Sequence, residues 1–255
     1  MGAGLRAAIF LAAGQGSRLR PLTNDKPKCL LPVGEKAVLD TLLPYALTKP
    51  EREIVIVGGY CASQLKKHLA EHYPGHPIKF VVNENFLNDV NILSLDVGVD
   101  ALEMPELGYT VIETDLLMSP NCWRIIHAAE KKTTSFWVTS GRYGPSLTGG
   151  IVHVPSPKAK VEHIDYIPLY DPAYDDWHKM VGILSVAPKQ VEADRNFRKQ
   201  ALEQSTQQYY MVPWINHLPE LPCKIVDLGT EYVRSFNTPE EYDRACNDFI
   251  SRVCK

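Results

Sequence analysis

The residues near the start of the chain could handle phosphate groups. Two glycines, Gly14 and Gly16, stand close together, and the basic residues Arg18 and Lys28 follow them. Glycines let the backbone turn sharply and present N–H groups to a polyanion, whereas side chains would block its close approach. Arginine offers a planar fork for phosphate oxygens, and lysine adds a mobile point charge. We therefore predict a triphosphate site in this loop.

Two common phosphate motifs differ from this loop. A dinucleotide fingerprint needs a third glycine at the position of Leu19. A P-loop needs Gly-Lys followed by Ser or Thr, and that string does not follow here. The sequence therefore indicates neither a dinucleotide cofactor nor a Walker-type site. Taken alone, the loop could also be a glycine turn with two solvated basic residues.

The elements around the loop predict a parallel sheet. Apolar runs rich in β-branched residues predict buried strands at 7–11, 54–57, 78–82 and 109–112. Helical spacing of apolar residues alternates with them at 37–47, 62–73, 90–102 and 121–131. This alternation predicts an α/β fold with a doubly wound, mostly parallel, Rossmann-like sheet. Ligands bind such sheets at the carboxyl ends of the strands, and the glycine loop directly follows the first strand.

The pattern changes after residue 132. Short alternating runs predict strands at 135–139, 149–154, 160–167, 180–186, 224–227 and 233–236, with one helix at 191–204. These strands predict a mixed β extension over the site. Thr238, Pro239 and Glu241 mark the start of a last helix as its N-cap, first helical residue and capping-box partner. We see no linker and predict one domain, 1–255, with halves 1–132 and 133–255.

The string around the glycine loop resembles a family signature. Residues 11–23 read Leu-Ala-Ala-Gly-Gln-Gly-Ser-Arg-Leu-Arg-Pro-Leu-Thr, and residues 27–32 read Pro-Lys-Cys-Leu-Leu-Pro. They resemble the signature of sugar-phosphate and phosphocholine nucleotidyltransferases, which have a GT-A-type fold. The resemblance implies an enzyme that joins the nucleotidyl group of an NTP to a small phosphorylated metabolite and releases pyrophosphate. It implies a nucleotide-binding first half and an acceptor-binding second half.

Position by position, the resemblance also implies roles for individual residues. The nucleotide would be wrapped by Leu11, Ala12, Ala13, Gly14, Gly16 and Ser17. Arg18 would bind the β- and γ-phosphates, and Lys28 the α-phosphate together with the acceptor phosphate. The resemblance implies three catalytic residues: the basic residues Arg18 and Lys28 and the acidic residue Asp115.

A second segment indicates which nucleobase the NTP carries. Asn91 to Leu95 read Asn-Ile-Leu-Ser-Leu and resemble the Asn-x-x-Ser-Leu segment of phosphocholine cytidylyltransferases, in which the serine lies near the pyrimidine. The resemblance implies that Asn91 and Ser94 contact the nucleotide and that the nucleotide is CTP. The segment can equally be a helix start capped by Asn88 or Asp89.

A carboxylate at the end of the fourth strand could bind Mg²⁺. Asp115 follows that strand, where it could hold the ion together with triphosphate oxygens, although it could also be a turn residue. Glu113 is an alternative, and because adjacent strand residues point to opposite faces we expect only one of the two to face the metal. Many relatives have aspartate where this chain has Asn237, and an amide is a poorer Mg²⁺ ligand. The second ligand is therefore open between Asn237 and Asp227, and Asn237 could also be only a turn residue.

The acceptor is less well defined. Trp137, Tyr210 and Trp214, together with Tyr209, could form a cage for a cationic head group, or they could simply belong to the core. Members of the resembling family act on sugar 1-phosphates, phosphocholine and aminoethylphosphonate. A sugar-1-phosphate nucleotidyltransferase that uses UTP, GTP or dTTP is therefore the alternative to a cytidylyltransferase.

Composition argues against several partners. A net charge of −3 and a pI near 6.2 provide no field that would attract nucleic acid. The apolar stretch near the start is too short to span a bilayer, so we expect no membrane association. The six cysteines lack metal or redox spacing, which favours free thiols and a cytoplasmic location. The sequence leaves open whether copies of the chain form a homo-oligomer.

Two other classes of function compete with this prediction. His68, Glu71 and His72 spell the His-x-x-Glu-His pattern of a zinc peptidase, although a solvated helix surface gives the same letters. A nucleotide-binding regulator that has lost turnover is the second competitor, because Asn237 departs from the family pattern.

Overall fold

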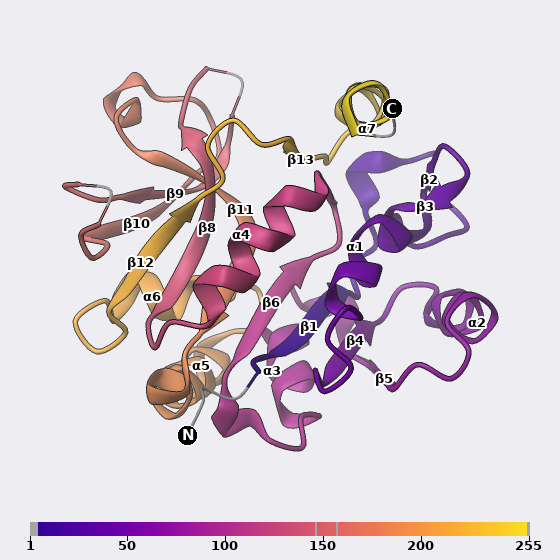
Figure 1. Cartoon of the computed structure of the whole chain (residues 1–255), viewed down its shortest axis with the longest axis horizontal. Coiled ribbons are helices and arrows are strands. Elements are labelled where there is room, and N and C mark those ends of the chain that lie inside the picture. Colours follow the sequence, from indigo (N-terminus) through magenta and orange to yellow (C-terminus); the bar gives the residue numbers. More distant parts are fainter. Residues whose placement is uncertain (1–4, 146, 157, 254–255) are drawn as a thin grey trace.

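A mixed β-sheet with helices on both faces organises the molecule (Figure 1). This computed structural model describes residues 5–145, 147–156 and 158–253. Within them the strands of the large sheet are β1 (Ala7–Ala12), β4 (Ile54–Gly58), β5 (Ile78–Val82), β6 (Tyr109–Glu113), β8 (Ser135–Arg142), β9 (Gly149–His153), β10 (His163–Ile167), β11 (His178–Val186) and β12 (Cys223–Asp227). Two small sheets pair β2 (Pro32–Val33) with β3 (Lys36–Ala37), and β7 (Leu116–Met118) with β13 (Val233–Ser235).

The parallel part of the sheet runs in the order β6-β1-β4-β5. Side chains alternate along β1, so that Ile9 belongs to one hydrophobic cluster and Phe10 to another, and both are fully buried. The helices on the side of Ile9 are α3 (Ile92–Asp100), α5 (Val191–Gln204) and α6 (Val212–Asn216). Those on the side of Phe10 are α1 (Val38–Ala46), α2 (Ala62–His72) and α4 (Pro120–Glu130). The predicted doubly wound α/β sheet is confirmed.

The antiparallel part begins at β11, which pairs with β6, β8 and β9. β10 continues the sheet beyond β9, and β12 lies parallel to β8. The predicted mixed extension is therefore confirmed, although its strand at 160–167 begins only at His163. The short strand β7 and the short helix α6 were not predicted, because they are too brief to show a period.

One predicted buried strand is only half-buried. β5 lies at the edge of the sheet, its residues are mostly of intermediate exposure, and Lys79 is exposed. An edge strand has a neighbour on one side only, so its side chains are less completely covered. The prediction of a strand at 78–82 is confirmed, and the prediction that this strand is buried is wrong.

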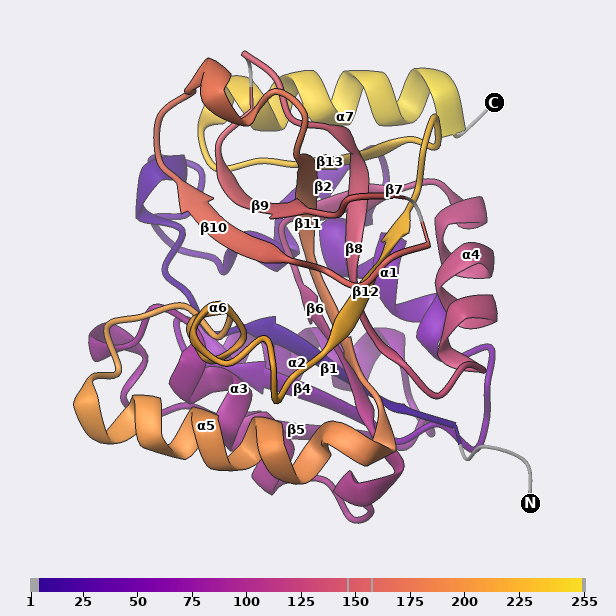
Figure 2. The same cartoon turned by 90° about the vertical axis from the view of Figure 1, so that its left-hand side faces the viewer.

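The last helix, α7 (Pro239–Val253), begins as predicted. Thr238 Oγ1 accepts a hydrogen bond from the Glu241 N–H at 3.3 Å, and the Glu241 carboxylate accepts one from the Thr238 N–H at 3.3 Å. Figure 2 shows α7 along one end of the molecule, with α5 along the opposite end. This placement brings the residues just before α7 to the carboxyl ends of the parallel strands.

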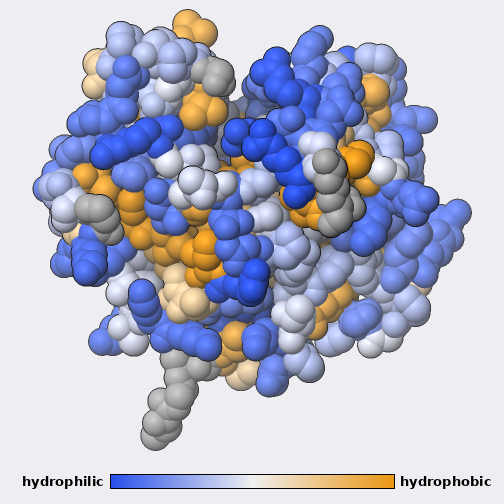
Figure 3. Space-filling view, turned by 45° about the horizontal axis from the view of Figure 1, so that its top comes forward, coloured by the Kyte–Doolittle hydropathy of each residue, from blue (hydrophilic) through white to orange (hydrophobic). Residues whose placement is uncertain are grey.

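The surface of the molecule is mainly polar on the side seen in Figure 3. Hydrophobic residues form limited patches on this face. In the described part of the chain, no helix is long and apolar enough to cross a membrane.

Free thiols are found at Cys29, Cys61, Cys122, Cys223 and Cys246, whereas Cys254 lies outside the described residues.

Candidate active site

The glycine loop leaves the carboxyl end of β1 and turns at Gly16. Gly16 has φ 60° and ψ 37°, a left-handed conformation that favours glycine. A Cβ atom there would lie 3.2 Å from Thr23 Cγ2 and 3.3 Å from Lys28 Cβ. At Gly14, by contrast, an added Cβ would meet no heavy atom within 4 Å among the described residues. The fold itself therefore needs a glycine at position 16, and space for a ligand is the remaining reason for one at position 14.

A cavity of about 270 Å³ opens beside this loop, and we call it the loop pocket. The predicted nucleotide-contact residues all line it: Leu11, Ala12, Ala13, Gly14, Gly16, Ser17, Arg18, Lys28, Asn91 and Ser94. The two metal-ligand candidates Asp115 and Asn237 line it as well. The structure thus brings together residues that are separated by more than 200 positions in the chain.

The small sheet of β7 and β13 brings Asn237 beside Asp115. Ser235 pairs with Leu116, and the Phe236 N–H donates to the Asp115 carbonyl oxygen at 3.2 Å. Asp115 precedes β7 and Asn237 follows β13, so the antiparallel pairing places both at the same end of this small sheet.

Four polar side chains meet at this point. Lys28 Nζ lies 2.8 Å from Asp115 Oδ2 and donates to Asn237 Oδ1 at 3.2 Å. Arg18 donates to the same amide oxygen at 2.9 Å. A single neutral oxygen therefore accepts from two cations, which holds both of them at the mouth of the loop pocket.

Asp115 has an oxygen free for a further partner. Its Oδ1 atom is buried and makes no hydrogen bond with the described residues, although a buried carboxylate oxygen is normally satisfied. Oxygen donors suit Mg²⁺, and Glu113 and Asn237 line the same cavity. Among the described residues no group of three His, Cys, Asp or Glu side chains could hold an ion by itself. The site therefore fits an ion that also binds oxygens of the substrate.

The expectation that only one carboxylate of this strand faces the site is wrong. Glu113 and Asp115 both line the loop pocket, because β6 ends at Glu113 and Asp115 lies in the bend between β6 and β7, where strand alternation no longer applies. Burial, and then the negative charge of Asp115, raise the pKa of Glu113 to about 7, against the opposing effect of Lys28 and Lys179. Gly182 makes room for this carboxylate, since an added Cβ would lie 2.6 Å from Glu113 Oε2.

The Asn91 to Leu95 segment is held by its own hydrogen bonds. Asn91 donates to Glu113 Oε1 at 3.2 Å and accepts from the Tyr210 N–H at 2.8 Å. Ser94 Oγ donates to Asp89 Oδ2 at 2.7 Å, and Asp89 also accepts from the Ser94 N–H at 2.8 Å. The N-cap of α3 is Asn91, and the Asp89 carboxylate, two residues earlier, accepts from the N–H groups of Leu93 and Ser94 in the first turn. Asn91 and Ser94 also line the loop pocket.

A second cavity of about 140 Å³ adjoins the first, and we call it the strand pocket. The two cavities share Arg18, Glu113, Asp115, Tyr209 and Asn237. The other walls of the strand pocket are built by antiparallel strands and the segment before α6: Trp137, Thr148, Gly149, Gly150, Tyr166, Lys179, Met180, Val181, Gly182, Tyr210, Met211 and Ser235.

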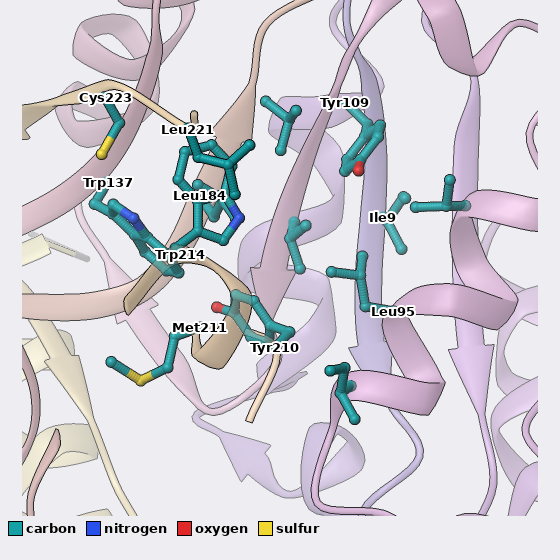
Figure 4. Packing of buried hydrophobic residues seen from close by; sticks show 14 of the residues in the cluster. Ile9, Leu95, Tyr109, Trp137, Leu184, Tyr210, Met211, Trp214, Leu221 and Cys223 are labelled. Carbon is teal, nitrogen blue, oxygen red and sulfur yellow. The ribbon is translucent and has the colours of Figure 1, made fainter. Parts of the chain in front are cut away.

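The predicted aromatic cage is only partly present. Trp137 and Tyr210 line the strand pocket and stack with their ring centroids 5.7 Å apart. Trp214 is fully buried, lines neither cavity and donates from Nε1 to Asp194 Oδ1 at 2.8 Å. Figure 4 shows it packed among the core residues around Leu184 and Leu221. Its assignment to acceptor binding is therefore wrong, and the alternative of a core residue holds.

Sequence reasoning assigned no site role to several residues of the strand pocket, among them Tyr166 and Lys179, although the family resemblance extends through residues 179–183. The Tyr166 ring stacks on that of Tyr209 at 4.6 Å, and their hydroxyls lie 3.0 Å apart. Burial lowers the pKa of Lys179 to about 8, although Glu113 and Asp115 oppose the shift. A lysine directly beside the apolar run 180–186 is the one sequence signal that could have identified it.

Asp227 is not at this site. Its Oδ1 accepts from Thr139 Oγ1 at 3.1 Å, from the Gly141 N–H at 2.7 Å and from the Gly229 N–H at 3.4 Å. It lines neither the loop pocket nor the strand pocket. Asp227 ties the end of β12 to β8 and the following turn, so the structure does not support it as the second metal ligand.

The histidine pattern of α2 forms no zinc site. The rings of His68 and His72 stack with their centroids 4.1 Å apart, and His68 Nε2 lies 2.8 Å from Asp40 Oδ1. Glu71 is paired with Lys67 at 3.8 Å on the helix surface. The described residues hold no cluster of three potential metal ligands here, so the peptidase alternative finds no structural support.

The fold and the site define an α/β protein with a glycine-rich, basic loop at the carboxyl end of β1 and a carboxylate opposite it. Residues 7–156, more than half of the chain, match the model of the nucleotidyl transferase family. The chain belongs to this family.

Several curated proteins are similar over part of their length. The 2-aminoethylphosphonate cytidylyltransferase of Lancefieldella rimae is 37% identical over 113 residues, which cover 44% of this chain and 44% of that protein. The choline-phosphate cytidylyltransferase of Streptococcus pneumoniae is 35% identical over 117 residues, 46% of this chain and 48% of that protein. The UTP–glucose-1-phosphate uridylyltransferase AglF of Haloferax volcanii is 38% identical over 73 residues, 29% of this chain and 30% of that protein. The chain thus spans less than half the length of these relatives.

Solved structures share the fold over nearly the whole chain. The CTP:phosphocholine cytidylyltransferase LicC of Streptococcus pneumoniae superposes with a TM-score of 0.79 at 21% identity and covers 96% of this chain and 99% of its own. A putative glucose-1-phosphate thymidylyltransferase of Bacillus anthracis gives 0.77 at 18% identity, with 96% and 95% covered. At these identities the likeness establishes the fold alone.

Proposed function

We propose that this protein transfers CMP from CTP to a small phosphorylated metabolite and releases pyrophosphate. The observation that carries the proposal is the cluster of Arg18, Lys28, Asp115 and Asn237 at the junction of the loop pocket and the strand pocket. A nucleotide in the loop pocket and an acceptor in the strand pocket would meet at this cluster. The family to which the chain belongs supports nucleotidyl transfer as the reaction.

The reaction we propose is one in-line displacement at phosphorus. An oxygen of the acceptor's phosphate forms a bond to the α-phosphorus of the nucleotide, and the bond to the bridging oxygen breaks. Pyrophosphate leaves with the electron pair. The nucleophile is already an anion, so no general base and no covalent enzyme intermediate are required. Positioning and charge neutralisation then provide the catalysis.

Individual side chains divide this work. Arg18 binds the β- and γ-phosphates and stabilises the leaving pyrophosphate, and Lys28 stabilises the charge that develops at the α-phosphate. The backbone of residues 11–17 wraps the nucleotide. Asp115 would hold Mg²⁺, and Asn237 would join it once Arg18 and Lys28 turn from its Oδ1 to the phosphates; the ion would neutralise phosphate charge when bound. The free Oδ1 of Asp115 supports this placement.

The two halves of the single domain bind different substrates. We assign the nucleotide to residues 1–132, which provide every wall of the loop pocket except Tyr209 and Asn237. The acceptor belongs to residues 133–255, which build most of the strand pocket. CTP is favoured because two of the similar proteins are cytidylyltransferases and because Asn91 and Ser94 line the loop pocket. The uridylyltransferase among the relatives keeps UTP with a sugar 1-phosphate as the second candidate.

A matrix of substrates tests the proposal. CTP, UTP, GTP and dTTP are each combined with phosphocholine, 2-aminoethylphosphonate and glucose 1-phosphate in the presence of Mg²⁺, and pyrophosphate release is measured. We expect turnover with CTP and one of the first two acceptors. Turnover only with a sugar 1-phosphate and UTP, GTP or dTTP would show the CMP assignment to be wrong. Tight NTP binding without pyrophosphate release from any pair would instead favour a nucleotide-binding regulator.

A further inference from the structure

Lys179 is a half-buried residue with a desolvated ammonium that the loop signature does not explain. It lies near the start of β11, and its Nζ donates to the carbonyl oxygens of Gly150 and Met180. The ammonium lies against the backbone of β9, since a Cβ added to Gly149 would be 3.7 Å from Nζ. Lys179 lines the strand pocket but not the loop pocket.

This ammonium has no anionic partner in direct contact. None of the ion pairs within 4.0 Å among the described residues includes Lys179. Glu113 and Asp115 act on it only from a greater distance, and Asp115 is already paired with Lys28. An ammonium has three N–H donors, and the two carbonyls account for two of them. A buried cation without a paired anion is costly, so this arrangement favours an anionic ligand in the strand pocket.

The other two cations of the site, Arg18 and Lys28, already have partners. Lys28 contacts Asp115 and Asn237, and Arg18 contacts Asn237, all from the loop that follows β1. Both of them line the loop pocket, where a triphosphate alone would bring several negative charges. Arg18 lines the strand pocket as well, but it is hydrogen-bonded to Asn237, whereas Lys179 is the described basic residue that lines the strand pocket and not the loop pocket.

We propose that Lys179 binds the phosphate or phosphonate group of the acceptor and directs its attacking oxygen toward the α-phosphorus. This inference rests on the proposed nucleotidyl transfer and deepens it. Lys28 then serves the nucleotide alone, instead of both the nucleotide and the acceptor phosphate. The two carbonyls of Gly150 and Met180 fix the ammonium, so the acceptor group meets a preorganised charge.

Steady-state kinetics of Lys179→Met, Lys179→Arg and the control Lys224→Met test the inference. Lys224 is an exposed lysine on β12 that lines neither cavity. With the best substrate pair of the matrix, Lys179→Met should raise the KM of the acceptor by about 10- to 100-fold, the range for loss of a charged hydrogen bond. The KM of the nucleotide should stay within about twofold of the parent value. Lys179→Arg should recover part of the loss, and Lys224→Met should behave like the parent.

Separate measurements keep the outcomes distinct. Calorimetric binding of CTP without acceptor shows whether each variant is folded. If Lys179→Met fails to bind CTP, Lys179→Gln gives the same test, because its amide still donates to the carbonyls but carries no charge. An unchanged acceptor KM, or an equal rise in both KM values, would overturn the inference alone. A parent protein that turns over no pair would overturn the proposed function and this inference with it.

Discussion

The loop pocket and the strand pocket share one charged cluster but are built in different ways. The loop pocket is framed by one continuous stretch of backbone after β1, completed by side chains from α3 and β6. The strand pocket is framed by side chains of β8, β10 and β11 and by two glycines of β9, which are far apart in the sequence. Backbone N–H groups bind any triphosphate, whereas scattered side chains can be exchanged one at a time. Under the proposed assignment, substitutions in the strand pocket would change the acceptor preference without disturbing the loop pocket.

The largest effect is expected from the loop pocket. Lys28→Ala should lower kcat/KM by about 10³-fold, because it removes the positive charge at the α-phosphate. Initial rates of pyrophosphate release at varied CTP concentrations give the kcat/KM of CTP. Lys36→Ala, at an exposed position of strand β3, is the matched control. Activity within about tenfold of the parent, a barrier change of only ~1.4 kcal/mol, would remove Lys28 from the catalytic residues.

A second pair of variants compares Asp115, which lines both pockets, with Asp227, which lines neither. Asp115→Asn should lower kcat/KM by about 10²- to 10³-fold and should weaken the dependence of activity on Mg²⁺. Asp227→Asn should keep activity within about twofold and lower the free energy of unfolding by about 1 to 2 kcal/mol, since its three hydrogen bonds are weakened. Mg²⁺ titrations of activity and urea unfolding measure the two effects. The reverse result would return Asp227 to the site.

A glycine comparison probes the wall between the pockets. Gly182 and Gly229 have φ values of 72° and 59°, so alanine strains the backbone at both. Only at Gly182 would the new Cβ also collide, with Glu113, whereas at Gly229 no described heavy atom lies within 4 Å. Gly229→Ala should cost about 1 to 2 kcal/mol of stability, and Gly182→Ala clearly more, together with a lower kcat. Equal stability and activity of the two variants would show that Glu113 moves freely.

The smallest effects should distinguish the wall of the strand pocket from the core behind it. Trp214→Phe should lower the free energy of unfolding by about 1 to 3 kcal/mol, because it removes buried volume and the bond to Asp194, and leave the acceptor KM unchanged. Trp137→Phe should instead change the acceptor KM by a few-fold, because Trp137 lines the pocket. Thermal unfolding and acceptor kinetics measure both. A raised acceptor KM in Trp214→Phe would bring that residue back into the acceptor site.

The loop pocket could be predicted from the sequence because its chemistry is local. Gly14, Gly16 and Arg18 lie within five positions, and the strand before them has a clear period. Asp115 was recognisable because it ends a strongly apolar strand. The parallel, doubly wound arrangement of the first strands followed from the alternation of strands and helices.

The strand pocket could not be predicted in the same way. Trp137 and Trp214 are both buried tryptophans, and which of them borders a cavity depends on how β8 packs against α6. Lys179 has the sequence of an ordinary strand terminus, and its place in the pocket depends on the pairing of β11 with β9. Asn237 and Asp227 were both candidates for the second metal ligand, with Asn237 preferred for its position, and the pairing of β13 with β7 places Asn237 beside Asp115. Tertiary contacts between distant segments carry this information, and spacing along the chain does not.

The hydrogen bond from the Asn237 N–H to the Glu241 carboxylate, 2.7 Å long, links the start of α7 to the charged cluster. Tyr242 and Phe249 of that helix pack in the same hydrophobic cluster as Leu19 and Leu31, which lie in the loop that carries Arg18 and Lys28. This cluster is separate from the two that hold the sheet and its helices together. Local opening of the last helix would therefore loosen the basic loop and withdraw Asn237 at once. Heat or denaturant would then abolish turnover while the sheet is still folded.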